Sequence, residues 1–218
     1  MKPRGRWRRR VLIASLVLLA VVLGVGYYGL GRDPRLALEL LSMARADRDA
    51  RLASIEAGHP AVGDEAAPGQ LDAQDAVDRV DRRNTARLKE IVADVGWPGR
   101  SRVGAWGSNA AWLLVQHATE DHDFQVRVLR LMKAMAPSEV DQGDVAMLTD
   151  RILVQEGKKQ IYGSQFRCRK GRNTLSTPLA EPERVDELRR SVGLSTFAEN
   201  KRRIEKLYGA CPEERDTK

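Results

Sequence analysis

Apolar residues recur at helical spacing over most of the chain, in segments separated by glycine, proline and short polar runs. The first predicted amphipathic helix begins at Asp33-Pro34, because aspartate suits a helix N-cap and proline suits the first helical position. It keeps helical spacing up to Gly58. A second segment runs through Val77 and Val95 and ends at GWPG, residues 96–99, where glycine can cap the helix and proline cannot continue it. Two long helices are therefore predicted.

The same spacing predicts five more helices. The first begins at Ser108 or Asn109, the second covers 124–135, and the third ends at Gly157. The last two cover 182–192 and 196–208. Between the third and fourth of these lies KQIYGSQFRCRKGRNTLSTPL, in which successive residues would alternate between the two faces of a strand and KGRN would form a turn. This pattern predicts a short β-hairpin or an extended segment. The Gly- and Pro-rich stretch 58–70 predicts a mobile loop. The fold class is mainly α: a multi-helix, bundle-like domain at 33–208 with one short hairpin and a tail at 209–218.

The N-terminus has the pattern of a membrane anchor. A basic head, MKPRGRWRRR (1–10), precedes twenty residues without charge, 11–30. At about 1.5 Å per residue, a helix of that length spans the hydrocarbon core. The positive head favours a cytoplasmic N-terminus, so we expect a single-pass protein of the bacterial inner membrane with its domain outside the cytoplasm. The alternative is a cleaved signal peptide, with 11–23 as its apolar region and Gly24-Val25-Gly26 as a small-x-small site.

Charge and cysteine usage refine this topology. The net charge is +7, and the six basic residues of the head account for nearly all of it. The exported part is almost neutral, which argues against nucleic-acid binding, because such proteins concentrate basic residues on the folded domain. An oxidising compartment would allow a disulfide between Cys168 and Cys211, although spacing alone does not decide it.

The stretch AWLLVQHATEDHDFQ, residues 111–125, gathers polar side chains behind an apolar run. Asp121 is well placed to N-cap the following helix, which makes this mostly a helix junction. Gln116 and His117 are not explained by the junction. His117 is either a hydrogen-bonded core histidine or a general acid–base group, since histidine exchanges protons near neutral pH. No H-E-x-x-H or comparable spacing occurs, so we predict no metal and no cofactor.

Two other polar groups stand out. Asp150-Arg151 lies inside an apolar helix and is typical of a partly buried salt bridge. Gln160, Tyr162 and Gln165 offer amide and hydroxyl groups that could orient a polar ligand. The fingerprints of nucleophile-elbow hydrolases, Walker A proteins and Rossmann proteins do not occur in the sequence.

Several blocks together resemble a bacterial domain family of unknown function. They are ELLSMARADRDAR, VDRRNTARLKEIV, GWPGRSRVG, NAAWLLVQHA, DFQ, LTDRILVQEG, QIYGSQF and EPERVDELRRSVGL. Members of that family carry similar ELLxM, RRNxxRL, GWPG, AAWLLxQH, DR and QxYGTQ blocks in this order. The resemblance covers roughly 38–199 and implies a shared fold without a known activity. Relatives tend to have proline where His122 stands, and soluble relatives lack the anchor. The blocks single out Asp47, Arg51, Asp81, Asn84, Trp97, Gln116, His117, Asp150, Arg151, Gln160, Tyr162 and Gln165.

These residues support two hypotheses in which the domain has a functional site. Met43, Asp47 and Arg51 share one helix face. This face either carries only an intrahelical Asp–Arg pair, or it meets His117, Gln160 and Tyr162 across the core and lines one polar pocket with them. In the first hypothesis the domain binds a polar ligand or an envelope protein, and the binding candidates are Gln116, His117, Arg151, Gln160, Tyr162, Gln165, Arg51 and Asn84. In the second it is an envelope hydrolase or lyase with His117 as general base and Asp150 or Asp47 orienting it. A structural spacer without a site is the third option.

Overall fold

The computed structural model describes residues 13–15, 24, 29–58, 68–169 and 172–208. The basic head, most of the predicted anchor at 11–30, most of the predicted loop and the tail at 209–218 lie outside these residues. Within the described ranges, no helix combines the length and the apolar character needed to cross a bilayer. The transmembrane helix of the predicted fold class is therefore not part of the described structure.

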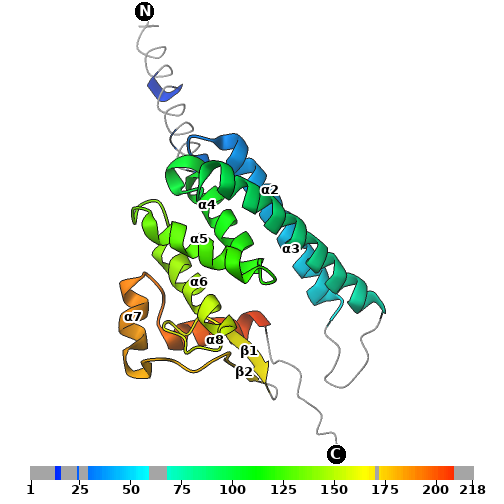
Figure 1. The fold of residues 1–218 in the computed structure, drawn as a ribbon, viewed down its shortest axis with the longest axis vertical. Helices are drawn as coiled ribbons and strands as arrows, with labels where there is room; N and C mark the ends of the chain where they lie inside the picture. The colour runs from blue at the N-terminus through cyan, green and yellow to red at the C-terminus, as the bar shows by residue number, and fades with distance from the viewer. Residues whose placement is uncertain (1–12, 16–23, 25–28, 59–67, 170–171, 209–218) are drawn as a thin grey trace, which may run out of the picture.

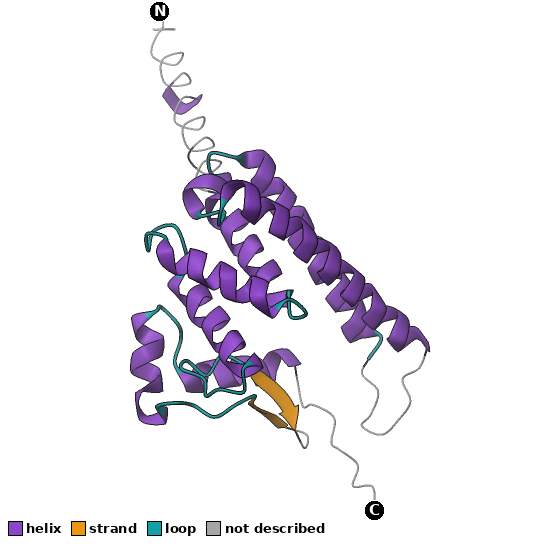
Figure 2. Ribbon diagram, viewed as in Figure 1, coloured by secondary structure: helices purple, strands orange, loops and turns teal. Residues whose placement is uncertain are grey.

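The described chain is mainly helical, as predicted, with a small two-stranded antiparallel sheet. Helices α2 (Pro34–Glu56) and α3 (Pro68–Val95) form a long antiparallel pair, and α4 (Arg100–His117) packs mainly against α2. Helices α5 (His122–Ala134) and α6 (Gln142–Gln155) pack on each other beside α4 (Figure 1). The lower part of the molecule holds the strands and the last helices (Figure 2). These are β1 (Phe166–Arg169), β2 (Arg172–Leu175), the 3₁₀ turn η1 (Pro182–Arg184), α7 (Val185–Ser191) and α8 (Phe197–Tyr208).

Three helix caps that the sequence predicts are present in the structure. The Asp33 carboxylate accepts a hydrogen bond from the Leu36 amide at 3.1 Å and caps α2. Asp121 caps α5 in the same way through the Phe124 amide. Thr196 and Glu199 form the reciprocal capping box of α8. Local side chain to backbone bonds of this kind depend on few residues, which is why the sequence predicts them.

Three boundaries differ from the sequence-based expectation. Helix α4 starts at Arg100 instead of Ser108 or Asn109, with a kink at Gly104, whose φ is 68°. Pro68–Gln70, expected in the loop, form the first turn of α3. The predicted helix at 182–192 begins as a 3₁₀ turn. The kink explains the first difference, because a break in helical geometry between 100 and 108 interrupts the apolar periodicity.

The core lies where α2, α3, α4 and α5 meet. Leu40, Leu88, Val103, Leu114 and Val128 are buried there. The β-hairpin pairs Phe166 with Leu175 and Cys168 with Asn173, at the predicted turn. Cys168 is disulfide-bonded, and the chain's other cysteine, Cys211, lies outside the described residues.

Candidate functional site

Four charged or polar side chains from three helices meet at one end of the core. Asp47 and Arg51 lie one turn apart on α2, Asp81 lies on α3, and His117 is the last residue of α4. We call these four residues the Asp47 cluster. Asp47 and Arg51 lie on one face of α2, as their spacing predicts, and that face meets Asp81 of α3 and His117 of α4.

Arg51 sits at the centre of the cluster. Its Nη2 donates to both carboxylate oxygens of Asp81 at 2.8 Å, and its Nε lies 3.3 Å from Asp47 Oδ1. The Asp47 side chain is only 2% exposed, so its charge needs these partners to be tolerated in the core. The guanidinium therefore links α2 to α3 while it neutralises a buried carboxylate.

His117 is oriented by Asp47. Its Nδ1 lies 2.8 Å from Asp47 Oδ1 and 3.0 Å from Oδ2. An ionised carboxylate only accepts hydrogen bonds, so we assign a proton to Nδ1. Arg51 Nε also lies 3.1 Å from this Nδ1. Because two N–H groups cannot hydrogen-bond each other, we assign the hydrogen on Arg51 Nε to a bond with Asp47 Oδ1. The neutral imidazole then carries its lone pair on Nε2, for which the described residues supply no hydrogen-bond partner.

The two aspartates of the cluster differ in their proton affinity. Burial alone would raise the pKa of Asp47, but the hydrogen bond with His117 and the charges of His117 and Arg51 outweigh it, so the pKa is lowered. Burial raises the pKa of Asp81, and the Arg51 guanidinium offsets only part of that effect. Asp47 is thus the more firmly ionised of the two carboxylates. It is the one that bonds the imidazole.

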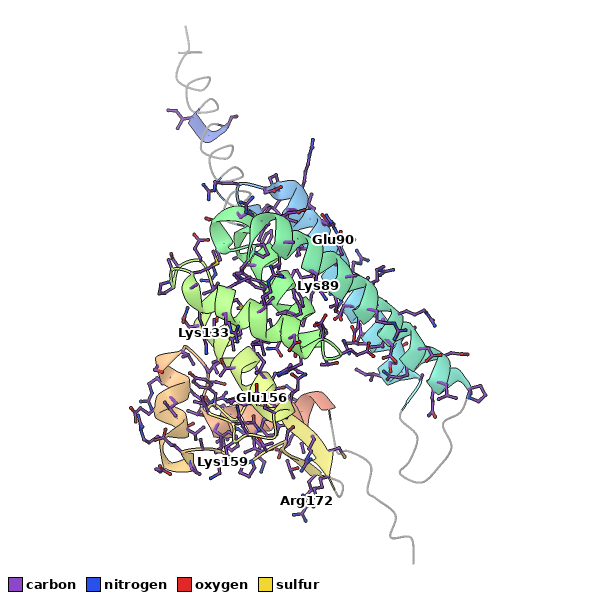
Figure 3. The ribbon with its side chains drawn as sticks, viewed as in Figure 1. Lys89, Glu90, Lys133, Glu156, Lys159 and Arg172 are labelled. Carbon is purple, nitrogen blue, oxygen red and sulfur yellow. The ribbon has the colours of Figure 1, made fainter. Side chains whose placement is uncertain are left out.

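A groove of about 520 Å³ opens beside the cluster, between α3 and the junction of α4 with α5. It is lined by Asp78, Asp81, Arg82, Thr85, Ala86, Lys89, His117, Ala118, Thr119, Glu120 and Asp121. The residues from α3 recur at spacings of three and four, so they form one face of that helix. Lys89, labelled in Figure 3, bridges the groove to Asp121 with a 2.7 Å ion pair. The volume is sufficient for a small molecule.

The groove carries an excess of negative charge. Four carboxylates line it, against the basic side chains of Arg82 and Lys89. Lys89 is paired with Asp121, and Arg82 lies 3.9 Å from Glu120. Asp47 and Arg51 add one charge of each sign behind the groove, so the balance stays negative when His117 is neutral. Such a lining raises the local concentration of cations.

Asp47, Asp81 and His117 also have the spacing of metal ligands. One ligand atom from each lies within 4.8 Å of the other two. The Arg51 guanidinium already occupies the position among them that a cation would take, with its Nη2 on Asp81 and its Nε near Asp47. We therefore assign no metal to the cluster in this arrangement.

The remaining candidate on α4, Gln116, faces a different neighbour from His117. It is buried, and its Oε1 accepts a hydrogen bond from Arg151 Nε at 2.5 Å. Asn84 is buried within α3 and donates to the Met43 carbonyl at 3.3 Å, which ties α3 to α2. Neither Gln116, Asn84 nor Arg151 lines the groove described here.

Asp150 and the segment 160–165 form a separate polar unit. The buried Asp150 carboxylate accepts hydrogen bonds from the amides of Ile161, Tyr162 and Ser164, at 2.8 to 3.2 Å. The unit is not part of the groove's lining. Asp150 therefore fixes a backbone turn, and His117 is oriented by Asp47.

The glutamines of this unit hold the same turn. Gln160 is fully buried, and its side chain bonds the Gln165 amide and the carbonyls of Gln165 and Thr177. Arg189 is also buried and donates to the Tyr162 carbonyl at 2.7 Å. Gln165 donates to the Met147 carbonyl on α6. These side chains are therefore not part of the groove beside the Asp47 cluster, and the prediction that Gln160 and Tyr162 line one pocket with His117 is wrong for this groove.

In the sequence, Asp81 stands out only through the family resemblance, which implies no role for it. The missing information is which face of α3 meets α2. Asp78, Asp81, Thr85 and Lys89 do recur at helical spacing, and this polar stripe is the local signal that could have pointed to the groove.

The comparisons with known proteins identify a family and give no activity. A family model with the description "Family of unknown function (DUF6624)" matches residues 34–211. The match includes every residue of the Asp47 cluster and of the groove. No curated protein and no solved structure matches the chain.

Proposed function

Since the chain belongs to this family of unknown function, matched over residues 34–211, we propose a function from geometry alone: the groove beside the Asp47 cluster binds a small polar ligand through His117. The observation that carries the proposal is the Asp47–His117 pair, 2.8 Å apart, at the wall of a groove of about 520 Å³. Asp47 holds the imidazole in one tautomer, which leaves Nε2 as an acceptor for a ligand proton.

The charge of the lining favours a ligand with an amino group or another cationic group. Four carboxylates face the groove with two basic side chains, and both of the latter lie near carboxylates of the groove. An anionic ligand would have to overcome this excess of like charge, whereas an ammonium group reduces it. His117 Nε2 can accept a hydrogen bond from the same ammonium group.

A second candidate is an enzyme, a hydrolase or lyase, with His117 as general base. The specific observation in its favour is again the orientation of the imidazole by Asp47, because a carboxylate on Nδ1 stabilises the imidazolium that forms when Nε2 takes a proton. Of the two orienting residues considered from the sequence, Asp47 is the one in contact with His117. A ligand that binds and is also converted would separate this candidate from simple binding.

We further propose that the domain is anchored in the bacterial inner membrane by residues 11–30 and works on the outer side. The support is the uncharged run behind a basic head, together with a disulfide at Cys168 that suits an oxidising compartment. In this setting the ligand is a polar small molecule of the cell envelope.

The proposal is tested by ligand-observed NMR on the full-length chain in detergent micelles. The probes are matched small primary amines, carboxylates, phosphate esters and neutral sugars. We expect the amines to show saturation transfer and the anions to show none. Ala86→Trp, which fills the groove, should remove the signal, whereas Ala93→Trp, on the same helix outside the groove, should keep it.

Binding of no amine, or amine binding that survives Ala86→Trp, would contradict the proposed ligand class and site. The same samples decide the enzyme candidate. If wild type converts a bound compound and His117→Asn does not, His117 acts on its ligand; if every bound compound is recovered unchanged, that candidate is wrong while the binding proposal stands.

A further inference from the structure

The residues that follow the predicted anchor are docked on α4 through backbone hydrogen bonds. The Arg32 amide donates to the Ser101 carbonyl at 3.2 Å, and the Asp33 amide donates to the Arg102 carbonyl at 2.7 Å. The Arg32 guanidinium adds bonds to the Ser101 carbonyl and hydroxyl. The described chain therefore passes from residue 29 into α2 without a free linker.

Glycines make this contact close. Gly31 and Gly104 both have positive φ, 67° and 68°, and a Cβ on either would collide with the backbone of the opposite segment. A Cβ on Gly29 would lie 2.7 Å from the Trp106 ring. The two segments touch backbone to backbone, so the orientation of the domain relative to residue 29 is fixed by packing.

Trp106 is an exposed, large aromatic side chain at this end of the domain. It is 54% exposed although its ring lies over Gly29. Indole rings prefer the interface between lipid and water, because one part is apolar and the N–H stays hydrated. Three arginines lie along the same docked segments: Arg32 and Arg35 are exposed, and Arg102 is half-buried. Their charge suits the phosphates of lipid headgroups.

We propose that the surface formed by Arg32, Arg35, Arg102 and Trp106, here called the anchor face, rests on the headgroup layer of the membrane. The occupant is the lipid bilayer, because the uncharged run ends at residue 30, next to this surface. This inference depends on the proposed membrane anchoring and goes beyond it. An anchored domain on a flexible tether would not touch the bilayer with a defined face.

The docking also fixes how far the groove lies from the bilayer. Asp47 is fourteen residues beyond Asp33 on α2. At about 1.5 Å per residue, the Asp47 cluster is held at most about 20 Å from the anchor face.

The inference is tested with the full-length chain in vesicles of phosphatidylcholine and phosphatidylglycerol, with and without brominated acyl chains near the headgroup. Every variant carries Trp7→Phe, so that the basic head contributes no signal. We expect brominated lipid to quench tryptophan fluorescence, and Trp106→Phe to abolish that quenching. The matched control is Trp112→Phe, which removes a half-buried tryptophan whose indole N–H bonds the Asp144 carbonyl, and it should keep the quenching.

Two failures are distinguishable. If the protein leaves the vesicles in an alkaline wash, the membrane anchoring itself is wrong. If it stays in the membrane but Trp106→Phe leaves the quenching unchanged, anchoring stands and the docked anchor face is wrong.

Discussion

Arg51 acts as an internal cation among three groups that could otherwise hold a metal ion. Its guanidinium bonds Asp81 with two 2.8 Å contacts and lies beside the buried Asp47. The sequence predicted that Asp47 and Arg51 share a face and meet His117, because spacing on one helix is local information. It did not predict that Gln160 and Tyr162 would lie in another unit, because that separation depends on where Asp150 binds the chain eleven to fourteen residues later.

Replacement of Arg51 tests this role. We expect Arg51→Met to lower the free energy of unfolding by about 2 kcal/mol, because it leaves two carboxylates close together and Asp47 buried without its cation. The guanidinium is about a third exposed, so solvent reduces the loss from the value for a fully buried pair. Urea unfolding at neutral pH measures it.

The same variant gives a second, more specific result. With Arg51 removed, Asp47, Asp81 and His117 can close on a divalent ion, so millimolar Zn²⁺ or Mn²⁺ should restore stability to Arg51→Met. Arg82→Met, which removes an exposed arginine from the groove, is the matched control and should gain nothing from the metal. Equal metal effects on both variants would show that Arg51 does not fill a cation position.

Helix starts that carry a capping side chain were predictable from the sequence, whereas the kinked start of α4 was not. Asp33, Asp121 and Thr196 each cap a helix through a neighbour three residues away. The kink at Gly104 is held by contact with residues 29–31, about seventy-five residues earlier in the chain. A pattern read along the chain carries cap signals but not such distant contacts.

The N-terminus of α6 contains a carboxyl group that should make stability depend on pH. Burial raises the pKa of Asp144 to about 7 from 3.8, with repulsion from Asp141 adding to the shift. The folded state therefore holds this proton more tightly than the unfolded chain does. Stability falls as pH rises from about 4 to about 7, and the loss levels off near 4 kcal/mol above that range.

Asp144→Asn should remove this dependence. The variant resembles the protonated acid, so we expect it to exceed wild type in stability at pH 8 by a few kcal/mol and to match it near pH 4. Asp123→Asn changes an exposed aspartate in the first turn of α5 and should leave the pH profile unchanged. Parallel pH profiles for wild type and Asp144→Asn would mean that Asp144 is ionised in the fold.

For the whole molecule, the predicted topology links the N-terminal run, the docked anchor face and the disulfide. Composition identified the basic head and the uncharged run, since both are simple counts over the sequence. It could not identify the docking of residues 29–33 on α4, because that contact is made mainly between backbone atoms and joins segments about seventy residues apart. The mainly helical class was predictable from periodicity alone.

Thiol chemistry in cells tests the exported topology. The chain has two cysteines, and Cys168 is disulfide-bonded. Cells are quenched with acid to stop thiol exchange, and the protein is then treated with a maleimide-linked polymer that adds mass to each free thiol. If the domain lies outside the cytoplasm, the protein should take up no label before reduction and two labels after it. Two labels without reductant would place the domain in a reducing compartment.

The central claim is that Asp47 holds the proton on Nδ1 of His117 and leaves Nε2 of this groove-lining residue unprotonated. The most direct measurement is the tautomer of His117, from long-range ¹H–¹⁵N NMR of histidine-labelled protein at a pH where the ring is neutral. The claim predicts a protonated Nδ1 and an unprotonated Nε2 in wild type, and loss of this preference in Asp47→Asn. A proton on Nε2 in wild type, or a tautomer unchanged by Asp47→Asn, would contradict it.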